Sequence, residues 1–162
     1  MVRTKILTEQ QAYRRFTKLC ATAEYCSFDI MQRLLRANFA RNVAEQIVAR
    51  LEDEGYIDNS RYARAYVNDK LRFSNWGRHK ITLMLQAKRI DRNAIADALS
   101  VIDPEEYMAI LKRLIDSRRS STSAENEFEL NMKLMRFATS RGFELELIRQ
   151  CINTTEDYDT QY

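Results

Sequence analysis

Apolar residues recur along this chain with the three- and four-residue spacing of a single helix face. Within residues 107–115 they fall at i, i+3, i+4, i+7 and i+8: Tyr107, Ile110, Leu111, Leu114 and Ile115. The same spacing is found in four further sets: Val43, Ile47 and Leu51; Ile81, Met84 and Leu85; Ile95, Ala98, Leu99 and Ile102; Leu130, Leu134, Phe137 and Ala138. No segment alternates with the period of two that is typical of a half-buried strand. The pattern predicts an all-α protein.

Capping residues and glycines divide the pattern into nine predicted helices, near residues 8–23, 27–38, 41–54, 59–73, 77–88, 91–101, 104–117, 124–140 and 144–152. Three of them begin with a capping side chain three residues before a Glu or Gln: Thr8 with Gln11, Asp103 with Glu106, and Thr122 with Glu125. Pro104 suits the first position of a helix, and Gly55 and Gly142 suit the left-handed residue that ends one. The serine- and acid-rich segment 117–127 is predicted to be the longest link and to be mobile.

The helices show an internal repeat. A shift of 51 residues superposes Ile30 on Ile81, Leu34 on Leu85, Phe39 on Ile90, Val48 on Leu99 and Leu51 on Ile102. A further shift of 53 carries Ile81 to Leu134, Ile90 to Phe143, Ile95 to Ile148 and Leu99 to Ile152. We therefore expect three tandem three-helix repeats, 8–57, 58–102 and 103–152, which stack into an elongated curved array. The acidic tail 153–162 has no helical period and is expected to be frayed.

Composition removes several classes of function. The 162 residues include only three glycines, Gly55, Gly77 and Gly142, which lie too far apart for a glycine-rich nucleotide loop. One histidine and three cysteines without a C-x-x-C pair argue against a zinc site and a disulfide framework, so we expect no metal or other cofactor. No signal peptide or membrane-spanning run is found, which favours a soluble cytoplasmic protein. Nothing resembles a dimerising heptad seam, and a monomer is expected.

The charge is uneven along the chain. Residues 1–58 carry 9 basic and 8 acidic side chains, residues 59–103 carry 9 and 4, and residues 104–162 carry 8 and 11. The net charges are therefore +1, +5 and −3. We expect the middle third to attract an anionic partner, by a contact that weakens as salt is added.

Several segments together resemble the RecX family of recombinase regulators. They are GYIDNSRYARAYV at 55–67, WGRHKI at 76–81 with Leu85, KRI at 88–90, KLMRF at 133–137 and RGF at 141–143. The resemblance spans about residues 8–152. The chain departs from the family at Arg89, where glycine commonly follows the lysine, so this residue must avoid a left-handed backbone or bear its cost.

The resemblance implies a protein that is not an enzyme. Members of the family bind the RecA recombinase, lie along its filament on single-stranded DNA, and restrain its ATP hydrolysis and strand exchange. They thereby act on homologous recombination, DNA repair and the SOS response, and they are also reported to touch DNA directly. Single-stranded DNA is the expected nucleic-acid partner, and double-stranded DNA is a further candidate. Three linked units could bridge successive subunits of such a helical polymer.

Ten residues are candidates for contact with recombinase or DNA: Arg72, Trp76, Arg78, His79, Lys80, Lys88, Arg89, Arg92, Arg118 and Arg119. Trp76 could stack on a base, but next to Gly77 at a helix entry the favoured interpretation is packing against the core. No neighbouring carboxylate orients His79 as a catalytic base. The basic residues could also be no more than a solvated helical surface.

Two other classes of function stay open. A helix-turn-helix protein would bind duplex DNA without recombinase, through Arg, Asn or Gln on one recognition helix. A small enzyme would need converging titratable groups in a pocket, and the sequence offers no nucleophile with a base and no metal cluster.

Overall fold

The computed structural model describes residues 7–153. Over these residues it contains nine helices and no strands: α1 (Glu9–Thr22), α2 (Ser27–Arg36), α3 (Arg41–Asp53), α4 (Asn59–Arg72), α5 (Arg78–Ala87), α6 (Arg92–Ser100), α7 (Pro104–Ser121), α8 (Glu127–Ser140) and α9 (Leu145–Asn153). The predicted all-α fold is confirmed. The tail 154–162 lies outside the described residues.

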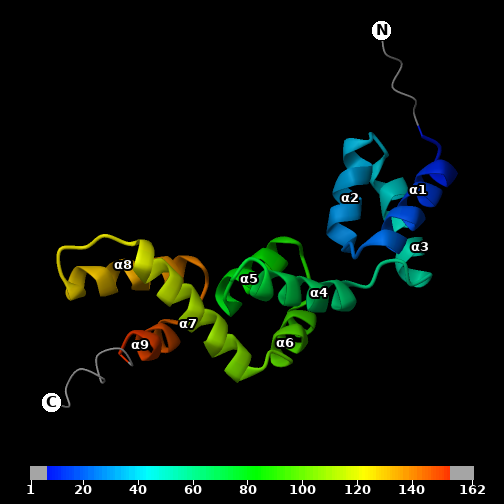
Figure 1. Ribbon diagram of the computed structural model, residues 1–162. Helices are drawn as coiled ribbons and strands as arrows, with labels where there is room; N and C mark the ends of the chain where they lie inside the picture. Colours follow the sequence, from blue (N-terminus) through cyan, green and yellow to red (C-terminus); the bar gives the residue numbers. More distant parts are fainter. Residues whose placement is uncertain (1–6, 154–162) are drawn as a thin grey trace, which may run out of the picture.

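Three successive three-helix units form an elongated, curved array (Figure 1). Unit 1 is α1–α3, unit 2 is α4–α6 and unit 3 is α7–α9, and in the figure they follow one another from the blue end of the chain to the red end. This arrangement confirms the predicted tandem repeat. The limits of the units at 57/58 and 102/103 stay a prediction.

The prediction that residues 117–127 form the longest link is wrong. Helix α7 continues to Ser121, and the hydroxyls of Ser120, Ser121 and Thr122 donate to carbonyls of its last turns. Thr122 is therefore the C-cap of α7 and does not cap the next helix. Asn126 caps α8 instead, accepting from the Glu129 N–H at 2.9 Å. The remaining link, 122–126, is no longer than 54–58 or 73–77.

The other predicted caps hold with one change. Thr8 and Gln11 form a complete capping box. Asp103 caps α7 with Pro104 in the first turn, but it accepts from the N–H of Glu105, and the Glu106 carboxylate binds Arg72 of unit 2 instead.

The second helix of each unit ends in the same way, which establishes the repeat at the level of the backbone. Asn38, Arg89 and Gly142 have φ of 65°, 57° and 94°. They are separated by the same shifts of 51 and 53 residues as the apolar positions. The residue after each one donates to the carbonyl five residues earlier: Phe39 to Leu34 at 3.2 Å, Ile90 to Leu85 at 3.1 Å, and Phe143 to Ala138 at 3.2 Å. Each is a Schellman motif, and Arg89 bears the left-handed backbone.

The core consists of two clusters, not three. Unit 1 has its own cluster around Phe16, Ile30 and Leu51. Units 2 and 3 share the other, in which Ile81 and Leu85 of unit 2 pack in one group with Tyr107 and Phe143 of unit 3. Units 2 and 3 therefore form one packed body, to whose core unit 1 adds the buried Cys26 and the partly buried Phe28.

We predict that the protein is more stable with glycine than with alanine at position 89, where φ is 57°. Arg89→Gly and Arg89→Ala both lose the guanidinium, so the difference between them isolates the left-handed backbone. The glycine variant should be more stable by about 1 kcal/mol in urea unfolding. At Arg64, in the middle of α4, the same pair should show the opposite order by a similar amount. Equal stability of the two Arg89 variants would contradict a left-handed backbone at this position.

Candidate functional site

The N-terminus of α5 is capped by unit 3. Gly77 precedes the helix and offers no side-chain cap. The Gly77 N–H donates to the Arg141 carbonyl at 2.8 Å, and the His79 N–H donates to the Gly142 carbonyl at 3.0 Å. These N–H groups have no partner within their own helix, so the loop between α8 and α9 satisfies them. The two units are thereby joined through backbone atoms.

This contact requires glycine on both sides. A Cβ on Gly77 would lie 2.4 Å from the carbonyl carbon and oxygen of Gly142. A Cβ on Gly142 would lie 2.4 Å from the backbone nitrogen of Lys80. Both distances are well inside van der Waals contact. The segments WGRHKI and RGF, which carry the family resemblance, are thus the two halves of one joint.

A polar triad supports the same joint. The Tyr107 hydroxyl accepts from the Arg78 backbone N–H at 3.1 Å and donates to a Glu144 oxygen at 2.5 Å. The Arg78 guanidinium binds the other Glu144 oxygen at 3.1 Å and lies 3.8 Å from the centre of the Tyr107 ring. Partial burial alone would raise the pKa of Glu144, but hydrogen bonds from Tyr107 and Arg78 outweigh it and lower the pKa. The carboxylate is therefore charged at neutral pH.

The joint between units 1 and 2 follows the same plan with side chains in place of backbone. The first N–H of α2, at Ser27, donates to the Asn59 side chain of unit 2 at 2.9 Å. Position 27 is related to Arg78 by the shift of 51, so the second helix of each of the first two units is capped by the unit that comes after it. Lys88 binds both Asp29 oxygens, at 2.8 and 2.9 Å.

Arg89 explains why the first joint has no backbone contact. It occupies the position of Gly142, and over the described residues α2 makes no counterpart of the backbone bonds at Gly77 and His79. An arginine there has a Cβ, which prevents the close approach that Gly142 allows. Its guanidinium lies 5.3 Å from the centre of the Phe28 ring. The first joint is therefore held by polar side chains and by Cys26 and Phe28 of unit 1, which pack against the core of units 2 and 3. The second joint is held by backbone hydrogen bonds and a shared core.

Much of the positive charge of the middle third is directed at neighbouring units. Four of its nine cations bind acids of unit 1 or unit 3, in the pairs Arg61 with Glu24, Lys88 with Asp29, Arg72 with Glu106, and Arg78 with Glu144. The excess of +5 is thus not all available to an outside partner.

Two of the other cations of unit 2 meet at the corner between α4 and α5. The Trp76 ring packs against the core and is partly exposed. The Nζ atoms of Lys70 and Lys80 lie 4.7 and 4.5 Å from the centre of its ring. Phe73, at the end of α4, is 81% exposed. We call Lys70, Phe73, Trp76 and Lys80 the Trp76 corner.

The ten candidate residues thus do not form one surface. Trp76 and Lys80 lie together at the Trp76 corner, with the exposed His79 beside them. Arg72, Arg78 and Lys88 belong to ion pairs between units, and Arg89 lies at the first joint. Arg92 is exposed at the start of α6, while Arg118 lies over Phe137 and Arg119 binds Glu127 at 3.5 Å, both in unit 3. Contact of any of the ten with a partner stays a prediction.

Sequence reasoning missed the residues that build the joints. Asn59 lies in the GYIDNSRYARAYV segment and Tyr107 on an apolar helix face, but nothing in the sequence marks either of them, or Glu144, as a contact between units. The shift of 51 could have indicated them, because it places Ser27 and Arg78 at the same helix start. Lys70 was missed because its relation to Trp76 depends on the fold of the 73–77 link.

Two absences within the described residues bear on function. No group of three or more His, Cys, Asp or Glu side chains within 7–153 is placed to hold a metal ion. None of the helices in that range has the length and apolar character required to cross a bilayer.

The fold and joints define a class of protein: an all-α array of three-helix domains in which the second helix of each of the first two is capped by the next domain. The family model for the second three-helix domain of RecX matches residues 58–99, and the model for the third matches 105–152. Together they cover more than half of the chain, which therefore belongs to the RecX family of regulatory proteins.

Relatives and solved structures agree with this assignment. The chain is 27% identical over 139 residues to Regulatory protein RecX of Acinetobacter baylyi, covering 86% of this chain and 84% of that protein. It is 29% identical over 116 residues to that of Thermus thermophilus, covering 72% of each. It spans only 61% and 62% of the length of the matching proteins from Clostridioides difficile and Clostridium perfringens.

Two crystal structures share the fold. One of regulatory protein RecX has a TM-score of 0.82 and 23% identity, covering 90% of this chain and 73% of that chain. One of RecX from Lactobacillus salivarius has a TM-score of 0.74 and 21% identity, covering 91% of this chain and 96% of that chain.

Gly77→Ala should disrupt the joint between units 2 and 3. The added methyl group overlaps the Gly142 backbone, so the free energy of unfolding should fall by about 2–3 kcal/mol in urea titration. Gly55→Ala is the control. A Cβ there meets no atom within 4 Å, although φ is +77°, and the cost should be near 1 kcal/mol. Equal effects at the two glycines would contradict the close approach.

Glu144→Gln should weaken the same joint in a pH-dependent way. Because the pKa of Glu144 is lowered on folding, its contribution to stability is present above the ordinary Glu pKa and is lost as pH falls through the folded value. The variant should be less stable than the parent by about 1–2 kcal/mol at pH 7. The free energies of unfolding of the variant and the parent should converge as the pH is lowered stepwise below the ordinary Glu pKa. A difference in the free energy of unfolding between variant and parent that stays constant with pH would be inconsistent with the charged triad.

Proposed function

We propose that this chain binds the filament that a RecA-type recombinase forms on single-stranded DNA and lowers its ATPase and strand-exchange activities. Membership of the RecX family supports this, because that family is named for regulation and not for a reaction. The observation that carries the proposal is the pair of joints. They hold three similar units in a fixed order along a curved array.

A row of linked units suits a helical polymer. The helices have 9–18 residues and are therefore roughly 14–27 Å long, so three units in succession could contact more than one filament subunit. A body that bridges neighbouring subunits restrains their relative motion. ATP hydrolysis and strand exchange, which depend on such motion, would then slow without any reaction at the regulator itself.

The Trp76 corner is the part of unit 2 that we propose makes contact. Its lysines have no ion pair among the described residues, and its aromatic rings offer apolar area to a partner. Arg89 and Arg92 add exposed positive charge on the same unit. Acidic protein surface and DNA phosphates are both complementary to this charge, and either contact would weaken with salt. We propose that the protein acts in the cytoplasm as a monomer.

The test is single-stranded-DNA-dependent ATP hydrolysis by a bacterial RecA, with this protein titrated in. The parent should inhibit at near-stoichiometric amounts. Lys70→Glu with Lys80→Glu should require about tenfold more protein, because the reversed charges repel an anionic partner. The matched control is Arg136→Glu with Arg149→Glu, two exposed residues of unit 3, which should inhibit as the parent does. Charge reversal at Arg78 or Lys88 would not be a clean test. A glutamate at either position would lie beside the acid that the parent residue binds, Glu144 or Asp29, and would disturb a joint.

Absence of inhibition by the parent would overturn the proposal. If the parent also bound duplex DNA tightly without recombinase, a helix-turn-helix mode of action would replace it. Equal inhibition by the corner variant and its control would keep the filament as the partner and exclude the Trp76 corner as the contact.

A further inference from the structure

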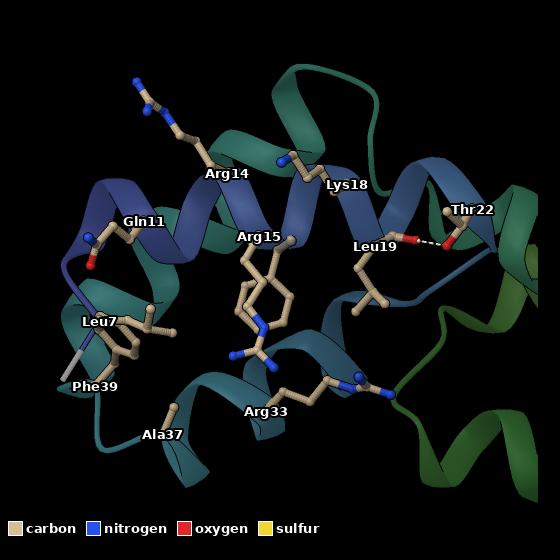
Figure 2. A pocket seen from close by; sticks show the side chains of 11 residues that line it. Leu7, Gln11, Arg14, Arg15, Lys18, Leu19, Thr22, Arg33, Ala37 and Phe39 are labelled. Atoms are coloured by element: carbon tan, nitrogen blue, oxygen red, sulfur yellow. Dashed lines mark hydrogen bonds between the residues drawn. The ribbon is translucent and has the colours of Figure 1, made fainter. Parts of the chain in front are cut away.

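Unit 1 contains a groove between its first two helices. Helices α1 and α2 each pack on α3 but not closely on each other, whereas α4 packs on α5 and α7 packs on α8. The space left open has a volume of about 710 Å³ (Figure 2). It lies in a different unit from the Trp76 corner, so a ligand of this groove can bind whether or not the corner contacts a recombinase.

The floor of the groove is apolar. Leu7, Leu19 and Phe39 are partly exposed there, and Phe16 closes the bottom as part of the unit 1 core. These side chains come from both sides of the gap between α1 and α2. A partner with an apolar stripe could cover all of them at once.

The walls of the groove are positively charged. Arg14, Arg15 and Lys18 of α1 and Arg33 of α2 line the space, and no acidic residue is among the described residues that do so. The Arg14 guanidinium extends away from α2 (Figure 2). Figure 2 shows Arg15 extending from α1 toward α2, with Arg33 on the opposite side. None of the four belongs to an ion pair within residues 7–153. They thus differ from the cations of unit 2 that bind neighbouring units.

We propose that this groove binds an acidic amphipathic helix of a partner protein. An apolar floor between basic walls is complementary to a helix with one apolar stripe and acidic flanks. Helix α1 has 14 residues and is therefore about 21 Å long, which matches a bound helix of three to four turns. The partner helix would lie along α1, its carboxylates reaching Arg15 and Arg33.

Other occupants fit less well. Single-stranded nucleic acid is bound by stacking successive bases on exposed aromatic faces. Of the two aromatic residues among the described residues that line the groove, Phe39 is partly exposed and Phe16 is only 7% exposed, so no row of stacking faces is formed. The preceding segment 1–6 contains Arg3 and Lys5, which the basic walls would repel. The acidic segment 154–162 of a second copy has the right charge, but its nine residues lack a helical apolar spacing.

The probe is a fluorescein-labelled designed peptide of about 14 residues, with leucine along one helix face and glutamate on the others. Fluorescence anisotropy should show saturable binding to the full chain. A second peptide with lysine in place of glutamate, and a third with serine in place of leucine, should each bind at least about tenfold more weakly. A labelled oligothymidylate and a peptide of residues 154–162 serve as the two alternative occupants.

Variants locate the binding. Arg15→Glu with Arg33→Glu should weaken the acidic peptide about tenfold or more. Ala37→Trp, which fills the groove without changing charge, should weaken it by a similar factor. Arg36→Glu, exposed on α2 outside the groove, is the control and should change binding less than about twofold. Circular dichroism and thermal unfolding establish that each variant is folded.

Several results would overturn the proposal. These are equal binding of the acidic and lysine peptides, no loss with either groove variant, or an equal loss with Arg36→Glu. Oligothymidylate binding that is lost with Arg15→Glu and Arg33→Glu, while the acidic peptide fails to bind, would assign the groove to nucleic acid. Tight binding of the 154–162 peptide that is lost with Arg15→Glu and Arg33→Glu, while the acidic designed peptide fails to bind, would assign the groove to a second copy of this chain.

Discussion

The arrangement of the three units depends on where the first backbone N–H groups of their helices find hydrogen-bond acceptors. The first N–H groups of any helix lack partners in their own helix, and most helices supply a capping side chain. Here α2 and α5 have no such cap and obtain one from the next unit, through Asn59 and through the Arg141 and Gly142 carbonyls. Helix α8, in the last described unit, is capped by its own Asn126. The need of the α2 and α5 N–H groups for acceptors therefore joins each unit to the next.

The two joints differ in kind because of one backbone position. Gly142 lets the backbones of units 2 and 3 touch, and a shared core covers that contact. Arg89, at the equivalent position, keeps unit 1 at side-chain distance, where Lys88 and Asp29 form the main bridge. Backbone bonds and a buried core are insensitive to salt, whereas a partly exposed ion pair is weakened by it. The joint between units 1 and 2, to which unit 1 contributes only Cys26 and Phe28 of the second core cluster, is therefore the one more sensitive to salt.

The sequence predicted the fold well because its strongest signals are local or periodic. The spacing of apolar residues gave the helices, and the superposition of Phe39, Ile90 and Phe143 already marked the three equivalent turns. The link after α7 was misjudged because a serine-rich composition suggested a loop. In the structure Ser120 and Ser121 stay in the helix, and their hydroxyls bond carbonyls of the preceding turn.

The partners of the charged residues could not be predicted in the same way. Lys88 and Asp29 are 59 residues apart, and Arg78 and Glu144 are 66 apart, so their pairing depends on how the units are placed. Hydrogen exchange of the Gly77 and His79 amides in the full chain tests the capping of one unit by the next most directly. Capping by unit 3 predicts that they exchange as slowly as amides in the middle of α5. Exchange as fast as that of Asn93, whose N–H meets only the exposed Asp91 side chain, would contradict it.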